Sequence, residues 1–126
     1  MRRIVAPTLV RATGSLAGEI ERSGARIRIG LPLWLRPLAR GRILAITLGR
    51  SIHLHPSILR RSEERIVATL RHELVHVRQT AALGLARFLV RYVREYLSFR
   101  RSGLGHDEAY RRISFEQEAF EEERLV

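Results

Sequence analysis

The sequence predicts a small α+β domain in which a short antiparallel sheet packs on a helix that carries two histidines. Two observations predict this class. Short apolar or alternating segments occur before residue 56, as expected for strands, and longer segments with helical apolar spacing follow residue 62. The length of 126 residues fits one domain, so we expect residues 1–126 to form a single unit.

The strands are predicted in the first half of the chain. Ala25–Ile29 alternates apolar and charged residues, which is typical of a half-buried strand. Residues 31–41 contain two prolines and a glycine and are predicted to form a loop. Ile43–Leu48 and Ile52–Leu54 are apolar and a Gly-Arg-Ser segment separates them, so we expect a hairpin.

The helix that carries the histidines is predicted to begin after Ser62. Serine is a favoured N-cap, and two glutamates follow in the first turn, where the helix dipole favours negative charge. Apolar residues recur at helical spacing to about Thr80, and Gly84 marks a break. A second helix is predicted over Leu85–Phe99, with an apolar face opposite its arginines.

Shorter helical segments complete the predicted fold. Ser102–Gly105 is predicted to be a loop and Asp107–Arg112 one or two helical turns. The last helix is predicted to start at Ser114, because Ser114 and Gln117 have the spacing of a capping box. We therefore expect two or three helices besides the one that carries the histidines.

The predicted function depends on the segment His72-Glu73-Leu74-Val75-His76. Residues four apart lie on one face of a helix, so the imidazoles of His72 and His76 can share one metal ion. Glu73 points to the side, where its carboxylate can take a proton from a metal-activated water. This pattern predicts a zinc site with Glu73 as a general base.

A catalytic zinc usually has a third protein ligand, which must come from elsewhere in the chain. The chain has no cysteine, so the ligand is a carboxylate or a histidine. Glu116, Glu118 and His106 are the candidates. Glu116 and Glu118 are two apart, about 200° around a helix, so only one of them can face the metal.

Other polar residues near the motif are candidates for supporting the metal ligands or binding substrate. Gln79 lies one turn after His76 and could support a ligand or line the substrate cleft. Tyr110 or His106 could donate a hydrogen bond to a developing oxyanion. His53 and His55 alternate along a strand that could bind a peptide as an added strand, although polar residues on an open sheet face are the favoured interpretation.

The motif helix also resembles a known family. Arg71–Gln79 is similar to the His-Glu-Leu-x-His-x-x-Gln signature of small, uncharacterised bacterial zincin-like domains of the gluzincin type, related to those found with extracellular contractile injection systems. The resemblance covers about residues 43–120. It includes the hairpin before the motif and Phe115–Ala119, which looks like the helix that carries the gluzincin carboxylate ligand.

This resemblance implies a metallopeptidase site with one zinc ion. Glu116, followed three residues later by a small residue, matches the third ligand of gluzincins better than Glu118 does. The implied ligands are therefore His72, His76 and Glu116, with Glu73 as general base.

The uneven distribution of charge along the chain indicates which kinds of molecule the protein could bind. The net charge of +10 comes entirely from arginine and lies in residues 1–62, where 12 arginines face two glutamates. This half could dock an acidic partner. No nucleic-acid-binding motif accompanies the charge, so we expect no specific nucleic acid. Trp34 and the arginines of Leu85–Phe99 raise membrane association as a third alternative, which ordinary packing of such helices disfavours.

The sequence thus predicts a zinc-dependent metallopeptidase that hydrolyses peptide bonds of a peptide or protein substrate. The alternative is a metal-binding interaction module without catalysis, which docks an acidic partner through its arginine-rich first half. No signal peptide or membrane-spanning segment is recognised, so a cytoplasmic location is expected.

Overall fold

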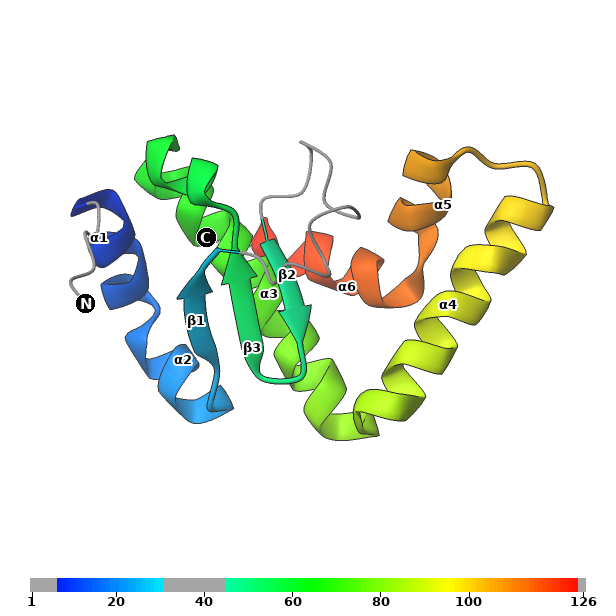
Figure 1. Cartoon of the computed structure of the whole chain (residues 1–126), viewed down its shortest axis with the longest axis horizontal. Coiled ribbons are helices and arrows are strands. Elements are labelled where there is room, and N and C mark those ends of the chain that lie inside the picture. Colours follow the sequence, from blue (N-terminus) through cyan, green and yellow to red (C-terminus); the bar gives the residue numbers. More distant parts are fainter. Residues whose placement is uncertain (1–6, 31–44, 125–126) are drawn as a thin grey trace.

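A three-stranded sheet and six α-helices make up the described fold, in which α3 lies against one face of the sheet (Figure 1). The computed structural model describes residues 7–30 and 45–124. The helices and strands are, in order, α1 (Pro7–Ser15), α2 (Ala17–Ser23), β1 (Arg26–Ile29), β2 (Ala45–Leu48), β3 (Ser51–Leu54), the 3₁₀ helix η2 (Pro56–Arg60), α3 (Glu63–Leu83), α4 (Leu85–Arg101), α5 (His106–Arg112) and α6 (Ser114–Glu123). The predicted α+β class is confirmed. The loop predicted over residues 31–41, Trp34, and the start of the hairpin at Ile43 lie outside the described residues.

The sheet is mixed and not wholly antiparallel as predicted. The hairpin is confirmed, because β2 pairs antiparallel with β3, and Ile46 is opposite His53. However, β3 is the central strand, and β1 pairs with its other edge in parallel, with Arg28 opposite His53. The prediction was wrong about β1 because a strand pattern in the sequence gives neither the neighbour nor the direction of a strand.

The helices α1 and α2 were not predicted from the sequence. Their sequences contain glycine, serine and threonine, which have only modest or poor helix propensity. Packing stabilises this region instead, since Leu9, Ala12 and Leu16 are buried in the same core cluster as the inner faces of β3 and α3. Tertiary burial therefore outweighs local propensity here.

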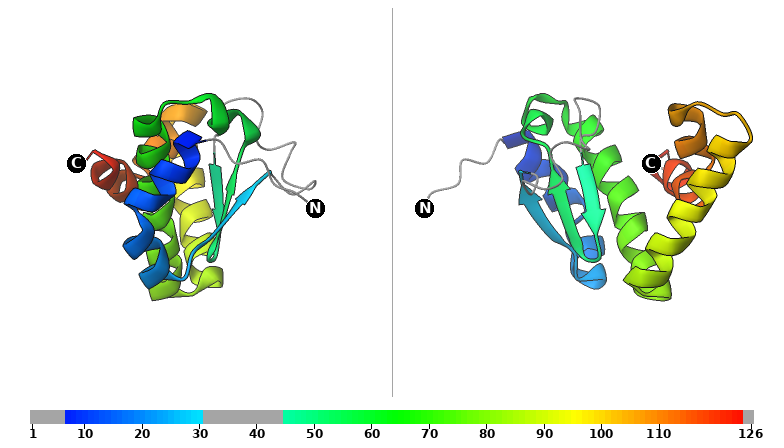
Figure 2. Two further views of the ribbon diagram at one scale, coloured as in Figure 1. Left: turned by 90° about the vertical axis from the view of Figure 1, so that its left-hand side faces the viewer. Right: turned by 45° about the vertical axis from the view of Figure 1, so that its right-hand side comes forward.

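The motif helix α3 lies between two packed layers (Figure 2). Its start is as predicted, because Ser62 is the N-cap and its side chain accepts a hydrogen bond from the backbone N–H of Arg65 at 3.2 Å. The helix continues to Leu83, three residues beyond the predicted end at Thr80. It then ends at Gly84, whose φ of 88° favours glycine. Ile66, Leu70, Leu74 and Val77 pack towards the sheet and α1.

The second layer consists of α4, α5 and α6. Phe88, Ile113 and Phe115 form its buried cluster. The predicted capping box at Ser114 is wrong. The N-cap of α6 is Ile113, and Ser114 donates from its N–H and its hydroxyl to the two carboxylate oxygens of Glu95, at 2.7 and 2.9 Å.

The predicted apolar face of α4 is only partly buried. Phe88 is buried, and Tyr92 and Tyr96 are half-buried, but Leu85, Leu89, Val93 and Leu97 are exposed. A leucine at helical spacing in a sequence indicates that a face is apolar and not that a partner covers it. No helix in the described ranges is long and apolar enough to cross a membrane.

Removal of the α3 cap should destabilise the fold. We expect Ser62→Ala to lower the free energy of unfolding by about 1 kcal/mol, because the Arg65 N–H loses its partner. Urea denaturation of metal-free protein would measure the change. The same substitution at Ser98, an exposed residue within α4, is the matched control and should leave stability unchanged or slightly higher. Equal losses in both variants would contradict the capping role.

Candidate metal centre

The two motif histidines lie on the side of α3 that faces α6. Their rings are 5.0 Å apart between centroids, as expected for residues one helical turn apart. His72 and His76 are 5% and 6% exposed, and α6 covers them. A buried imidazole requires partners for its ring nitrogens, so the contacts of these nitrogens determine what the site can hold.

Glu116 on α6 completes the cluster. Its Oε1 lies 2.8 Å from Nε2 of His72 and 3.0 Å from Nε2 of His76. The carboxylate is 3% exposed, and Ala119, one turn later, is fully buried, which lets α6 approach closely. One ligand atom from each of these three residues lies within 4.8 Å of the other two, so the group could hold a metal ion.

The outer nitrogen of His76 is held by Gln79. Nδ1 of His76 lies 2.8 Å from Oε1 of Gln79. The orientation of this amide is fixed, because its nitrogen donates to the Phe115 carbonyl at 3.1 Å and to Glu118 at 2.6 Å. Oε1 of Gln79 is therefore the acceptor, and Nδ1 of His76 carries the hydrogen.

The outer nitrogen of His72 is held in the same way by Glu123. Nδ1 of His72 lies 2.7 Å from Oε1 of Glu123, which can only accept when ionised. A neutral imidazole with hydrogen on Nδ1 has a lone pair on Nε2. When neutral, both histidines would therefore direct a lone pair at Oε1 of Glu116, which is itself an acceptor.

Three converging acceptors repel each other unless protons or a cation lie between them. Nitrogen and oxygen ligands bind zinc at about 2.0–2.1 Å, so ligand atoms around a tetrahedral ion lie about 3.3 Å apart. The contacts of 2.8 and 3.0 Å need to open only slightly to reach that spacing. The donor set of His72, His76 and Glu116 therefore fits a metal ion of this size.

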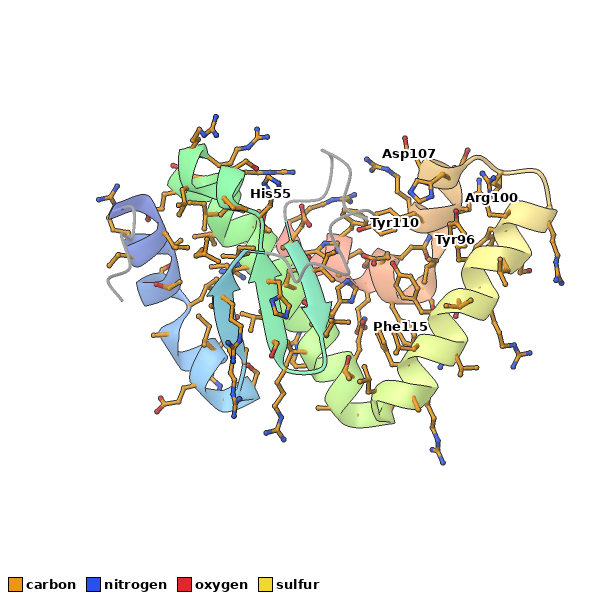
Figure 3. All side chains as sticks on the ribbon, viewed as in Figure 1. His55, Tyr96, Arg100, Asp107, Tyr110 and Phe115 are labelled. Carbon is orange, nitrogen blue, oxygen red and sulfur yellow. The ribbon has the colours of Figure 1, made fainter. Side chains whose placement is uncertain are left out.

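The second oxygen of Glu116 is also fixed. The hydroxyl of Tyr92 on α4 donates to Oε2 at 2.6 Å. Tyr110 on α5, which is labelled in Figure 3, also bonds to this carboxylate. Burial and the negative charge of Glu116 raise the pKa of both phenols, so the tyrosines stay protonated and act as donors.

Without a metal, protons stabilise the cluster. Burial lowers the pKa of His76, but its hydrogen bond to Glu116 and the charge of Glu73 outweigh burial and raise that pKa to about 9. The pKa of His72 is raised in the same way. Burial acts to raise the pKa of Glu116, but hydrogen bonds from both histidines outweigh it and hold the pKa below its ordinary value.

Glu73 lies beside the cluster without joining it. Its side chain is buried, and the hydroxyl of Thr47 on β2 donates to its Oε1 at 2.6 Å. Burial raises the pKa of Glu73, and the charges of His76 and His72 only partly offset this effect. A carboxylate with a raised pKa is a better proton acceptor, as a general base requires.

The other candidate ligands and hydrogen-bond donors, Glu118, His106 and Tyr110, lie at different places around the cluster. Glu118 bonds to Gln79 and is not among the three converging groups. His106 contacts the Tyr96 hydroxyl at 2.9 Å on the exposed side of α4 and α5 and is not part of the cluster. Tyr110 contacts the cluster through Glu116, where it supports a ligand.

The strand histidines do not form a peptide-binding edge. β3 has a partner strand on each side, so the strand that carries His53 cannot accept a further one. Burial and the charge of Arg28 lower the pKa of His53. His55 lies at the end of β3 (Figure 3), where its Nδ1 accepts a hydrogen bond from the Ser57 N–H and caps η2.

Three residues of the site were missed from the sequence. Tyr92 was assigned to the apolar face of its helix. A threonine within a strand is common, so Thr47 gave no indication of a role in the site. Glu123 did have a signal, because it follows Glu116 by seven residues and therefore shares its helix face. The acidic run around Glu123 obscured that spacing.

Comparison with known proteins supports part of the resemblance. A family model described as the eCIS core domain matches residues 35–83. The match covers the β2–β3 hairpin and α3 with both histidines, and it ends before the helix that carries Glu116. It spans less than half of the chain. No curated protein and no solved structure matches the chain.

Loss of the Tyr92 hydroxyl should weaken metal binding. Groups that orient metal ligands are typically worth about 10–100-fold in affinity, so we expect Tyr92→Phe to weaken zinc binding at least about tenfold. A competition titration with a chromophoric chelator would measure this. Tyr96→Phe is the matched control, because this hydroxyl, one turn along α4, bonds to His106, which is outside the three converging groups, and its loss should not affect affinity. Equal affinities in wild type and Tyr92→Phe would contradict the assignment.

The affinity for zinc should increase as the pH rises. Protons occupy His76 up to about pH 9 in the metal-free protein and must leave when the metal binds. Zinc affinity should therefore rise between about pH 6 and 8.5, by about tenfold per pH unit for each proton released. The stability that His76 gives the metal-free protein is full below the ordinary histidine pKa of 6.5 and is lost as pH rises through its raised pKa of about 9. A zinc affinity that does not change with pH would contradict the prediction that metal displaces protons from the histidines.

Proposed function

We propose that this chain is a zinc-dependent metallopeptidase that hydrolyses peptide bonds. The observation that carries the proposal is the convergence of two imidazole Nε2 atoms and one carboxylate oxygen, with a second buried carboxylate beside them. The resemblance of Arg71–Gln79 to zincin-like domains supports the same reaction class. The match to the eCIS core domain supports a relation to that family over residues 35–83 and assigns no activity.

Zinc is the metal that the donors favour. Two histidines and one glutamate are a common ligand set of catalytic zinc and leave a fourth position open for water or substrate. A zinc ion held there would polarise the substrate carbonyl and lower the pKa of a water molecule to about 7. His72 and His76 would hold the ion through Nε2 and Glu116 through Oε1, in the orientations set by Glu123, Gln79 and Tyr92.

Glu73 carries the proton transfers in this proposal. Thr47 occupies Oε1 of Glu73, which leaves Oε2 to take the proton from the attacking water. The raised pKa of Glu73 lets it keep this proton until the leaving amine accepts it. Thr47 thus sets which oxygen of the base faces the reaction.

The strand that carries Thr47 provides an edge along which a peptide can bind. Among the described residues β2 pairs only with β3, so its other edge has strand hydrogen-bonding groups without a described partner. A peptide bound along that edge would lie next to Thr47 and hence close to Glu73. Peptide addition was the less favoured interpretation of the strand that carries His53, and we propose it for β2 instead.

One observation favours a second candidate, a metal-stabilised interaction module without catalysis. His72, Glu73, His76 and Glu116 are all less than 9% exposed, whereas hydrolysis requires substrate to reach the metal. In this alternative the ion joins α3 to α6, and the arginine-rich first half docks an acidic partner. The two candidates share the metal and differ only in catalysis.

Replacement of Glu73, the proposed general base, distinguishes the metallopeptidase from the interaction module. We expect Glu73→Gln to retain one zinc per chain and to lower hydrolysis of a peptide library by about 10²–10⁴-fold, the usual contribution of general base catalysis. Product analysis by mass spectrometry, with metal content measured in parallel, would test this. Glu64→Gln, the same change at an exposed position of α3, is the matched control and should keep full activity. Zinc-loaded wild type that cleaves no peptide would favour the interaction module, and unchanged activity in Glu73→Gln would exclude the mechanism.

A further inference from the structure

The outer face of α4 is the main exposed apolar surface of the described fold. Seven large hydrophobic side chains of the described residues are exposed, and five of them lie on this helix: Leu85, Leu89, Val90, Val93 and Leu97. Val90 is the most exposed of the seven, at 58%. The helix lies at the edge of the molecule (Figure 1). Apolar surface gathered on one element marks an interaction site more often than scattered apolar residues do.

The helix cannot bury this face by rotating about its axis, because its inner face is already engaged. Phe88 stacks on Phe115 with ring centroids 4.6 Å apart. Tyr92 holds Glu116, as described above, and Glu95 caps α6. A rotation would break the support of a metal ligand and the cap of the helix that carries it. These contacts of the inner face fix the rotation of α4, so its outer face remains exposed to solvent.

The exposed residues have the spacing of a coiled-coil seam. Ala86, Val90, Val93 and Leu97 follow one another at intervals of four, three and four residues, and we call them the outer seam. These intervals place apolar side chains along one line of a helix, where a second helix can interlock with them. At 1.5 Å per residue the outer seam is about 17 Å long, enough for two to three turns of a partner helix.

A row of arginines borders the outer seam. Arg87, Arg94 and Arg101 are spaced by seven residues, so they form one line along the helix, next to Val90 and Leu97. No described acidic side chain pairs with any of the three. Glu95 is the only acid of α4, and its carboxylate binds Ser114 and Arg91. The outer face therefore presents apolar and positive groups without any negative charge of its own.

We propose that the outer face of α4 docks an acidic amphipathic helix of a partner protein. In a coiled-coil pairing, side chains that flank the apolar seam of one helix meet those that flank the seam of the other. The partner helix would insert aliphatic residues against the outer seam and place glutamates opposite Arg87, Arg94 and Arg101. This proposal is independent of whether the metal centre is catalytic.

Two other occupants fit the observations less well. A second copy of the chain, packed antiparallel through α4, would place one arginine row against the other, and like charges on facing positions are destabilising. A bilayer surface favours aromatic residues at the interface, but Phe88, Tyr92 and Tyr96 face inward, and Phe99, the fourth aromatic residue of α4, is half-buried. Charge complementarity and the narrow seam together favour an acidic helix.

Synthetic helices provide a direct test on the zinc-loaded full chain. The probe is a fluorescent three-heptad peptide with leucine on its seam and glutamate at the flanking positions, compared with one that has lysine there. We expect the glutamate peptide to bind at least about tenfold more tightly in fluorescence anisotropy, because three surface ion pairs replace three like-charge contacts. Added salt should reduce this preference.

Variants of exposed residues assign the interaction to α4 without affecting the fold. Arg87→Glu, Arg94→Glu and Arg101→Glu combined should reverse the preference, so that the lysine peptide binds more tightly. Val90→Asp should weaken binding of both peptides by at least tenfold, whereas Val10→Asp, the same change at an exposed valine of α1, should not. The zinc content of each variant should equal that of wild type, which confirms that the metal centre is intact.

Three results would overturn the proposal. One is equal affinity for the two peptides, or a preference that the charge reversal does not change. Another is a stable dimer in sedimentation that Val90→Asp dissociates, which would assign the face to a second copy. The last is binding to vesicles of phosphatidylserine and phosphatidylcholine, lost in Val90→Asp, with no peptide binding.

Discussion

The convergence of three hydrogen-bond acceptors inside the protein is the constraint on which the site depends. The outer nitrogens of His72 and His76 bond to Glu123 and Gln79, so the inner nitrogens of the neutral rings direct lone pairs at one oxygen of Glu116. Such an arrangement is stable only if protons or a cation occupy the space between the three groups. The high pKa of His76 in the metal-free protein expresses the same requirement.

Each part of the fold contributes to this constraint in a definite way. The sheet and α1 hold α3 from one side, and β2 also supplies the hydroxyl that orients Glu73. On the other side α6 supplies Glu116 and Glu123, and α4 fixes both the cap of α6 and the second oxygen of Glu116. The inner face of α4 therefore packs against the candidate metal site, and its outer face is exposed.

The sequence predicted what local patterns encode and missed what depends on tertiary packing. The start of α3, its break at Gly84 and the β2–β3 hairpin follow from capping, backbone freedom and strand alternation over short stretches. The choice of Glu116 over Glu118 rested on a small residue that permits close helix approach, and Ala119 is indeed buried. By contrast, the parallel pairing of β1, the helices α1 and α2, and the roles of Thr47 and Tyr92 arise between segments far apart in the chain, so no local pattern predicts them.

The account is tested most directly by the metal content of purified protein carrying a substitution at the carboxylate from α6. Mass spectrometry should find one zinc per chain in wild type and in Glu121→Gln, which changes an exposed glutamate of the same helix. Glu116→Ala should lose the zinc, because only two of the three converging ligands remain. Wild-type protein that binds no zinc, or Glu116→Ala that retains it with unchanged affinity, would contradict the proposed metal centre.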